Sequence, residues 1–391
     1  MSEGRAAPAE DPGGGEARRL VLVYIALFGA LGIQLPYWPV WLAHRGMEPD
    51  QIGLLLGIPT WARLAAPWAG SWADRRGRAG RLATGLAAVA LASYAAFALV
   101  DGFVPMLLLS AALGLALAPI SPLVDGLAIN AAAAGRLDYG RVRVWGSGAF
   151  VIASSLGGMA LQGRSPDLVL DALLIASAGL VAVTWWLPRT STNVLVPAIA
   201  PASAGAVLER PRLRAFLGAV AFMQGSHAVL YGFGTRHWQE IGLGESAIGW
   251  LWSWGVIVEV MLFAVGRRLV DRIGPTGMLI AAGVGGIVRW PLLAWVESLW
   301  VIAAVQTLHA ATFAAMHLGA MSWIRDSIPA ASMQRTTALY VAIGSGVALG
   351  TGMALAGVLY ERWAGDAYLA MAVSSALGLA CALRLGGRAR A

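Results

Sequence analysis

Apolar runs long enough to cross a lipid bilayer follow one another along almost the whole sequence. A membrane-spanning helix needs roughly 20 apolar residues, and this rule predicts twelve of them. The predicted helices cover residues 21–43, 51–73, 82–100, 104–128, 140–162, 168–187, 213–236, 246–268, 276–296, 299–323, 336–360 and 366–386. Charged residues make up only 13% of the chain, against about 25% in a soluble domain. We therefore expect an all-α membrane protein.

One long polar gap divides the predicted helices into two sets of six. It covers residues 188–212, and its Pro, Ser, Thr and Arg content is typical of a linker. The expected units are an N-terminal six-helix bundle over 21–187 and a C-terminal one over 213–386. Residues 1–20 are predicted to be a disordered tail and not a signal peptide, because the apolar run after them is too long for one. Residues 387–391 form a second short tail.

The arginines predict how the helices are oriented. All 28 basic residues are arginine. With the N-terminus inside, the cytoplasmic segments hold 22 of them and the outer loops hold four, at 45, 164, 236 and 362; Arg63 and Arg289 fall within helices. Since positive residues are retained on the cytoplasmic side, both termini are predicted to be cytoplasmic. Topology thus explains the net charge of +7, and no nucleic-acid partner is expected.

The sequence offers no signature of a metal centre or of an enzyme. The single cysteine, Cys381, excludes an intramolecular disulfide and a cysteine metal cluster. We find no His/Cys metal spacing, no phosphate-binding loop and no Ser-His-Asp signature. The chain is therefore predicted to be no enzyme, to need no cofactor or metal, and not to drive transport with ATP. A monomer would suffice.

A basic, glycine-flanked turn occurs twice, as "GSWADRRGR" from residue 70 and "GRRLVDRIG" from residue 266. Asp74 and Asp271 are 197 positions apart, close to half the chain, and each follows the second helix of its half. This spacing predicts two parallel, pseudo-symmetric six-helix repeats. The aspartate could cap a neighbouring helix while the arginines lie among lipid headgroups. The predicted gating motif comprises Gly70, Asp74, Arg75 and Gly77, and in the second half Asp271, Arg272 and Gly274.

These turns resemble the loop signature of the major facilitator superfamily. "GIQLPYWPVWL" (32–42), "DYGRVRVWG" (138–146) and "QTLHAATF" (306–313) resemble the lactose permease group within it. "SHAVLYGF" (226–233) and "IGWLWSWGVIVEV" (248–260) are similar to its phenylpropionate permease branch. The resemblance covers nearly all of residues 20–386. It implies the major facilitator fold, a bacterial inner-membrane location and secondary active transport by alternating access.

Ionisable groups within a span each cost about 2.5–3.5 kcal/mol on insertion scales, so each needs a partner or a water-filled cavity. Asp125 and Arg143 lie on helices joined by a short turn, so their side chains could meet at similar depth. They form either a structural ion pair or, as the resemblance implies, a substrate-binding pair. Phe150 shares a helix face with Arg143, and the resemblance implies that it stacks on the substrate.

Three ionisable residues lie within spans of the C-terminal half: Glu259, Arg289 and His309. The resemblance implies that they serve substrate binding and proton coupling, and a carboxylate beside a movable cation can carry a proton. The alternative is a packing network that neutralises Arg289. Thr312 stands where lactose permease has a second carboxylate, and Gln306 where it has a lysine, so the proton route cannot be copied whole. Glu259, with Asp125 or His309, is the predicted titrating group.

Several further side chains within the predicted spans are candidates to line the cavity. His227 and Tyr231 share a helix face and either line the cavity or belong to the core, and Gln34 could line it beside the Pro36–Pro39 break. Arg63 is expected to reach the headgroups or to act in gating. Trp252 and Trp254, close to Glu259, are the tryptophans expected nearest the site. His317 lies about 80° round the helix from His309 and faces either the site or a different neighbour.

The substrate is left open between two chemistries. Arg143 could bind a carboxylate, and the phenylpropionate branch implies an aromatic acid. Asp125 also suits the hydroxyl groups of a sugar or nucleoside, which the wider group carries. We predict a secondary active symporter that imports a small organic solute, such as 3-phenylpropionate, with a proton. Alternatives are a sugar or nucleoside symporter, an efflux antiporter, or a membrane sensor.

Overall fold

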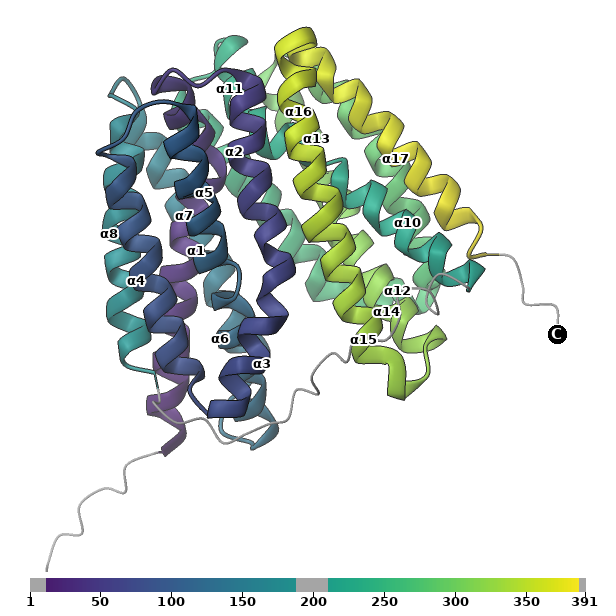
Figure 1. Cartoon of the computed structure of the whole chain (residues 1–391). Helices are drawn as coiled ribbons and strands as arrows, with labels where there is room; N and C mark the ends of the chain where they lie inside the picture. The colour runs from purple at the N-terminus through teal and green to yellow at the C-terminus, as the bar shows by residue number, and fades with distance from the viewer. Residues whose placement is uncertain (1–11, 188–209, 387–391) are drawn as a thin grey trace, which may run out of the picture.

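Two bundles of helices lie side by side, one from each half of the chain (Figure 1). The structure is a computed structural model and describes residues 12–187 and 210–386, without the side chains of residues 12–14, 70, 71, 74 and 75. Within these residues all regular structure is helical. The predicted all-α fold is confirmed.

The N-terminal bundle is drawn from purple to teal in Figure 1. Its helices are α1 (Pro12–His44), α2 (Pro49–Trp61), η1 (Ala62–Ala65), α3 (Ala66–Arg76), α4 (Ala79–Phe97), α5 (Phe103–Leu117), α6 (Ile120–Ala133), α7 (Tyr139–Leu161) and α8 (Asp167–Trp185).

The C-terminal bundle runs from teal to yellow in the same view. Its helices are α10 (Pro211–Gly225), α11 (Ala228–Glu240), α12 (Glu245–Trp295), α13 (Leu299–Gln306), η2 (Ala310–Ala315), α14 (Met316–Ser327), α15 (Ala330–Tyr340), η3 (Val341–Ala348), α16 (Leu349–Trp363), η4 (Ala364–Asp366) and α17 (Ala367–Leu383). Two of these, η2 and η3, are π-helices that interrupt longer α-helices. Such wider turns are frequent at functional sites.

The lengths of the helical segments are consistent with twelve spans. Among the described residues, nine segments are long and apolar enough to cross a membrane. Two of these, of 51 and 54 residues, contain a backbone break, at Gly274 and at Ala364 respectively. Each is more than twice the roughly 20 residues that one crossing needs, so each provides two spans. The continuous helix over residues 49–76 provides the remaining one.

Three of the differences from the predicted helix ends concern the predicted tail, the linker and the second repeated turn. Helix α1 begins at Pro12, so residues 12–20 are helical and the prediction of a disordered tail is wrong for them. The side chain of Leu20 is buried, and Glu16 accepts a hydrogen bond of 2.7 Å from Arg136, which ties this end of α1 to the bundle. Helix α10 begins at Pro211, within the predicted linker, because proline suits the first turn of a helix.

The third difference is in α12, where the predicted loop from residue 269 is largely helical and the chain turns only at Gly274. The predictions for 1–11, 188–209 and 387–391 lie outside the described residues.

The repeated turns share one backbone feature. Gly77 and Gly274 have φ angles of 58° and 73°, in the left-handed region that favours glycine. They occupy corresponding positions in the two "DRxG" sequences, so the second helix of each half ends in a similar way. Asp271 and Arg272 are exposed, and among the described residues Asp271 caps no neighbouring helix. The side chains of Asp74 and Arg75 lie outside the described part.

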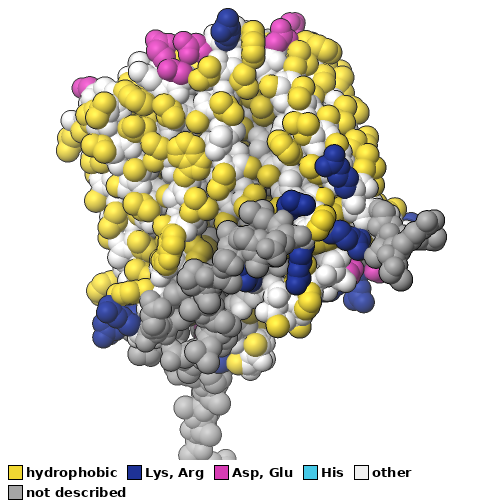
Figure 2. Space-filling view, turned by 45° about the vertical axis from the view of Figure 1, so that its right-hand side comes forward, with side chains coloured by type: hydrophobic (Ala, Val, Ile, Leu, Met, Phe, Trp, Pro, Cys, Tyr) yellow, Lys and Arg dark blue, Asp and Glu magenta, His cyan; other side chains and the backbone are white. Residues whose placement is uncertain are grey.

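Charge separates the two ends of the molecule. We call the end with the loops at 45–48, 98–102, 163–166, 241–244 and 296–298 the acidic face. The end with the turns at 77–78, 134–138 and 328–329 is the basic face. In the view of Figure 2, acidic side chains gather at the upper, acidic face, and most arginines lie toward the lower end. Between them the surface is largely hydrophobic, as expected for a belt in contact with lipid.

The two halves touch in the part of the molecule nearer the acidic face. Ser154 of α7 donates a hydrogen bond of 3.3 Å to the carbonyl oxygen of Gly249 in α12. Ser253 of α12 donates one of 2.8 Å to the carbonyl oxygen of Val151. At Gly158, a Cβ atom would collide with the Glu245 carbonyl oxygen, so glycine permits this close approach.

Helices α2 and α16 form the second contact between the halves, through Trp61 and Thr351, whose Nε1–H···Oγ1 distance is 3.3 Å. Toward the basic face, no hydrogen bond or ion pair joins the halves among the described residues. The ribbons of α3 and α15 stand apart there (Figure 1). The molecule is therefore closed at its acidic face and diverges toward its basic face.

Candidate functional site

Arg289 is the centre of a buried polar network in the C-terminal half. Its side chain, on the second part of α12, is 0% exposed. It donates hydrogen bonds of 2.7 Å to Thr312 Oγ1 and 2.7 Å to Gln306 Oε1, and its Nη1 lies 3.1 Å from His309 Nδ1. A buried charge is tolerated when such partners surround it. Thr312 and Gln306, two of the positions at which the sequence departs from lactose permease, thus supply neutral acceptors to the arginine.

The network continues from Thr312 to His227. His227 Nε2 lies 3.3 Å from Thr312 Oγ1, and its Nδ1 lies 3.0 Å from the carbonyl oxygen of Met223. A carbonyl oxygen can only accept, so Nδ1 of His227 carries a hydrogen. Arg289, Thr312, His227 and Met223 therefore form one continuous chain of hydrogen bonds. His227 is fully buried and belongs to this network.

His309 joins Arg289 to Glu259. Its Nδ1 faces the guanidinium of Arg289, and its Nε2 lies 3.3 Å from Glu259 Oε2. Because arginine only donates, Nδ1 of His309 must accept, and its single hydrogen lies on Nε2, toward the carboxylate. A second hydrogen on Nδ1 would set two donors against each other. The structure thus brings Glu259, Arg289 and His309 together, with the Glu259 side chain 18% exposed.

Asp125 in the N-terminal half is held by hydroxyl groups. It accepts hydrogen bonds from Tyr24 at 2.5 Å, from Tyr139 at 3.2 Å and from Ser121 at 3.3 Å. No ion pair links it to Arg143 among the described residues, so the interpretation of a direct structural pair is wrong. Tyr24, from α1, stands between the two residues, and its hydroxyl group takes the place of the arginine.

Arg143 lies against aromatic rings instead. Its guanidinium carbon is 4.0 Å from the centre of the Phe28 ring and 5.6 Å from that of Tyr24. Gly146, one turn further along α7, leaves the space in which Phe28 and the guanidinium lie. Within the described part of the chain no carboxylate lies within ion-pair distance of Arg143. The half-buried guanidinium is therefore available to an anion.

The groups from the two halves face one another across the middle of the molecule. Glu259 lies close enough to Arg143 to interact with it electrostatically. Tyr231 of α11 is also close enough to Glu259, Arg289 and Arg63 to interact with them electrostatically. We call Asp125, Arg143, Tyr231 and Glu259 the central site. Arg63 is exposed, near the middle of the helix over residues 49–76, and interacts electrostatically with Tyr231.

Of the other predicted lining residues, Phe150, Gln34 and Trp254 make no contact with the central site in the described structure, whereas Trp252 touches Tyr231. Phe150 is buried, and its backbone packs on Gly32 of α1. Gln34 is half-buried and makes no hydrogen bond there. Trp252 is buried beside Tyr231, with ring centres 6.2 Å apart, whereas Trp254 stacks on Trp250.

Three aromatic residues of the site were missed: Tyr24, Phe28 and Tyr139. Tyr24 and Phe28 are four residues apart on α1, so they share a helix face, and this spacing was the signal that could have found them. Tyr139 stands in the "DYGRVRVWG" sequence already singled out. Among the described residues no group of three His, Cys, Asp or Glu side chains could hold a metal ion. Cys381 is part of the hydrophobic packing of the C-terminal bundle.

A protein-family comparison decides the affiliation. The model of the MFS_1 like family matches residues 17–370. The chain belongs to this family of the major facilitator superfamily. It is therefore a multi-pass membrane transporter of small molecules and not an enzyme, as predicted.

Named relatives support the predicted branch of this transporter. This transporter is 34% identical, over 372 residues, to the Probable 3-phenylpropionic acid transporter of Escherichia coli (strain K12), covering 91% of this chain and 94% of the relative. It is 25% identical to the Maltose permease of Geobacillus stearothermophilus, over 96% and 97% of the two chains. The resemblance to phenylpropionate permeases is confirmed.

Solved structures show the same fold. The nucleoside transporter NupG superimposes with a TM-score of 0.84 at 15% identity, covering 95% of this transporter and 99% of NupG. A D-xylose-proton symporter gives a TM-score of 0.70 at 13% identity, covering 95% and 97%. At such low identity the likeness concerns the fold alone.

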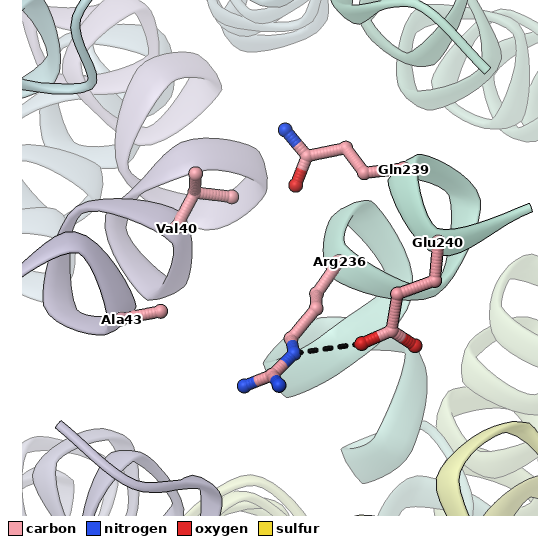
Figure 3. A pocket seen from close by; sticks show the side chains of 5 residues that line it. All are labelled: Val40, Ala43, Arg236, Gln239 and Glu240. Carbon is pink, nitrogen blue, oxygen red and sulfur yellow. Dashed lines mark hydrogen bonds and ion pairs between the residues drawn. The ribbon is translucent and has the colours of Figure 1, made fainter. Parts of the chain in front are cut away.

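A hollow lies at the acidic face of the transporter, away from the central site. Figure 3 shows it between Val40 and Ala43 of α1 and the polar end of α11, and its volume is about 340 Å³. Arg236 is paired there with Glu240 at 2.9 Å, and Glu240 also accepts a hydrogen bond of 2.5 Å from Tyr360. The hollow thus lies between α1 and α11, helices of the two halves, and its two charged residues are paired with each other.

Replacing Thr312 with valine is expected to destabilise the transporter. The change keeps the shape but leaves Arg289 and His227 each without one partner, and a buried polar group without its partner costs about 1–3 kcal/mol. The thermal unfolding midpoint of the detergent-purified protein should therefore fall. Thr307→Val is the control, since Thr307 accepts only an exposed hydrogen bond from Trp254. Equal midpoints for the two variants would contradict the network described above.

Proposed function

We propose that this transporter imports a small aromatic carboxylate of the 3-phenylpropionate type together with a proton. The observation that carries the proposal is the guanidinium of Arg143, which lies over the Phe28 ring and has no carboxylate partner among the described residues. A carboxylate could bind it through two parallel hydrogen bonds. The aromatic rings beside it provide an apolar surface for the rest of the ligand.

The surroundings of Asp125 favour this substrate over a sugar or nucleoside. Its two oxygen atoms already accept three hydrogen bonds from protein hydroxyl groups. A carboxylate offers about four acceptor positions, so little capacity remains for the hydroxyl groups of a sugar. The E. coli relative is named for 3-phenylpropionic acid. The sugar alternative keeps support from the relative named for maltose, which is 25% identical to this chain.

Glu259 is proposed as the proton carrier. Its neighbour His309 accepts from Arg289, so His309 cannot take up a proton without losing that bond. Glu259 has no such restriction, and neutralising it removes one negative charge from the region that faces Arg143. The site then gains affinity for an anion, which couples the proton to the carboxylate. One proton with one monocarboxylate moves no net charge across the membrane.

The orientation in the membrane follows from the asymmetry of charge. The positive-inside rule assigns the basic face, with its arginines, to the cytoplasm of a bacterial inner membrane. Both termini are then cytoplasmic, the opening between the halves faces inward, and one chain contains the complete site as a monomer. An efflux antiporter with the same geometry would exchange its substrate for a proton.

The test is transport by purified protein in sealed proteoliposomes. Labelled 3-phenylpropionate should enter faster with an inward proton gradient, and a trapped pH indicator should record one proton per substrate. A membrane potential alone should have no effect. Protein-free liposomes are measured in parallel, because the neutral acid crosses lipid unaided. Counterflow of sugars or nucleosides without counterflow of 3-phenylpropionate would reject the proposed substrate, and protons moving opposite to substrate would indicate an antiporter.

A further inference from the structure

His317 is an ionisable side chain that the proposed function does not yet use. It lies on α14, eight residues beyond His309, and is half-buried. Its Nδ1 is 2.9 Å from the hydroxyl oxygen of Tyr340 on α15, and its ring meets that of Phe263 edge to face at 6.1 Å. These contacts hold the imidazole in one place, between α12 and α15.

His317 stands on the basic-face side of Glu259. Phe263 is one turn further along α12 than Glu259, toward Gly274 and the basic face, and it is Phe263 that His317 touches. His317 also interacts electrostatically with Glu259. The carboxylate thus lies between two histidines, His309 toward the acidic face and His317 toward the opening. From the packed helices, Glu259 and Tyr340 are the titratable groups that face His317.

The hydrogen bonds of His317 leave one ring nitrogen free to exchange protons. The hydroxyl group of Tyr340 donates a long hydrogen bond of 3.9 Å to the sulfur of Met316, so its oxygen can accept from Nδ1–H of His317. In this tautomer Nε2 carries the lone pair. Nε2 has no hydrogen-bond partner among the described residues, and it is not fully buried. His309, in contrast, uses both nitrogens.

We propose that His317 passes the proton from Glu259 to the water at the basic face, a step that rests on the proposed proton coupling. Nε2 of neutral His317 takes the proton of the Glu259 carboxylic acid through a water molecule, which gives a carboxylate and an imidazolium. The imidazolium then releases the same proton from Nε2 to water and returns to its starting tautomer. Tyr340 positions the ring throughout by accepting from Nδ1–H. An imidazole suits this task because its ordinary proton affinity matches neutral pH.

The test compares two transport modes of the His317→Ala protein in proteoliposomes. Equilibrium exchange of labelled for unlabelled 3-phenylpropionate requires no net release of the proton and should keep the wild-type rate. Proton-driven net uptake should fall by about 100-fold, the lower end of what a positioned acid or base contributes. Added imidazole should restore net uptake in His317→Ala. His44→Gln, at the exposed acidic face, is the control and should match the wild type in both modes.

Three results would overturn the inference. They are wild-type net uptake by His317→Ala, equal losses of exchange and net uptake, and a loss of net uptake that imidazole does not relieve. Tyr340→Phe adds a second reading, because it removes the acceptor of Nδ1–H and should change the pH profile of net uptake but not of exchange. If wild-type protein exchanges substrate but shows no proton-driven uptake, the proposed function itself fails, and that result is distinct from the other three.

Discussion

Arg143→Ala is expected to lower the affinity for 3-phenylpropionate by about 30- to 5000-fold. Removing one partner of a buried, hydrogen-bonded charge pair costs about 2–5 kcal/mol, and each 1.4 kcal/mol is tenfold. Isothermal titration calorimetry of the detergent-purified protein measures the change. The neutral analogue 3-phenylpropanol should bind wild type and Arg143→Ala with similar, weak affinity, since it has no carboxylate for the guanidinium.

Arg141→Ala is the matched control for this loss. Arg141 lies on the same helix, is exposed, and is paired with Asp138 at 3.7 Å. The Arg141→Ala protein should bind 3-phenylpropionate with the affinity of the wild type. Arg143→Lys keeps the charge but loses the planar fork, so its affinity should fall between the two. Unchanged affinity in Arg143→Ala would exclude the guanidinium from the binding site.

Glu259→Gln is expected to abolish proton-driven accumulation while retaining exchange of substrate across the membrane. The amide oxygen can still accept the hydrogen bond from His309 Nε2–H, which lies 3.3 Å from the carboxylate in the native protein. The amide cannot release a proton, so the step that returns the empty carrier is lost. Measurements of labelled 3-phenylpropionate with and without an imposed proton gradient separate the two modes.

Glu245→Gln provides the control on the same helix. Glu245 opens α12 at the acidic face, where its side chain accepts a hydrogen bond of 3.4 Å from Gln239. Accumulation by this variant should respond to the gradient as in the wild type. If Glu259→Gln still followed the gradient, Glu259 would not be the proton carrier, and Asp125 would be the next residue to replace.

Much of the fold could be predicted because each part of it depends on short stretches of sequence. The length of an apolar run determines whether it can cross the bilayer, and the two "DRxG" sequences indicated where the second helix of each half turns. Both glycines, Gly77 and Gly274, have positive φ angles. Helix ends were less certain, since Leu20 and the Glu16–Arg136 pair extend α1 through contacts with other helices.

For the candidate site, the sequence predicted how deep in the membrane each residue lies, but not which side chains it contacts. Helical spacing placed Asp125 and Arg143 at similar levels, but it gave no information on α1, which inserts Tyr24 and Phe28 between and beside them. Which neighbour a side chain meets depends on how helices distant in sequence pack. For the same reason the hydrogen-bond partners of Arg289 could not be predicted from the sequence, although the sequence does show that Thr312 replaces a carboxylate of lactose permease.

The glycine and serine contact near the acidic face has a consequence for the speed of transport. The halves adjoin there through small residues, with hydroxyl groups of Ser154 and Ser253 bonded to carbonyl oxygens of the opposite helix. Each of these hydrogen bonds contributes only about 0.5–1.5 kcal/mol net. Breaking them therefore adds little to the free-energy barrier for separating the two halves at the acidic face.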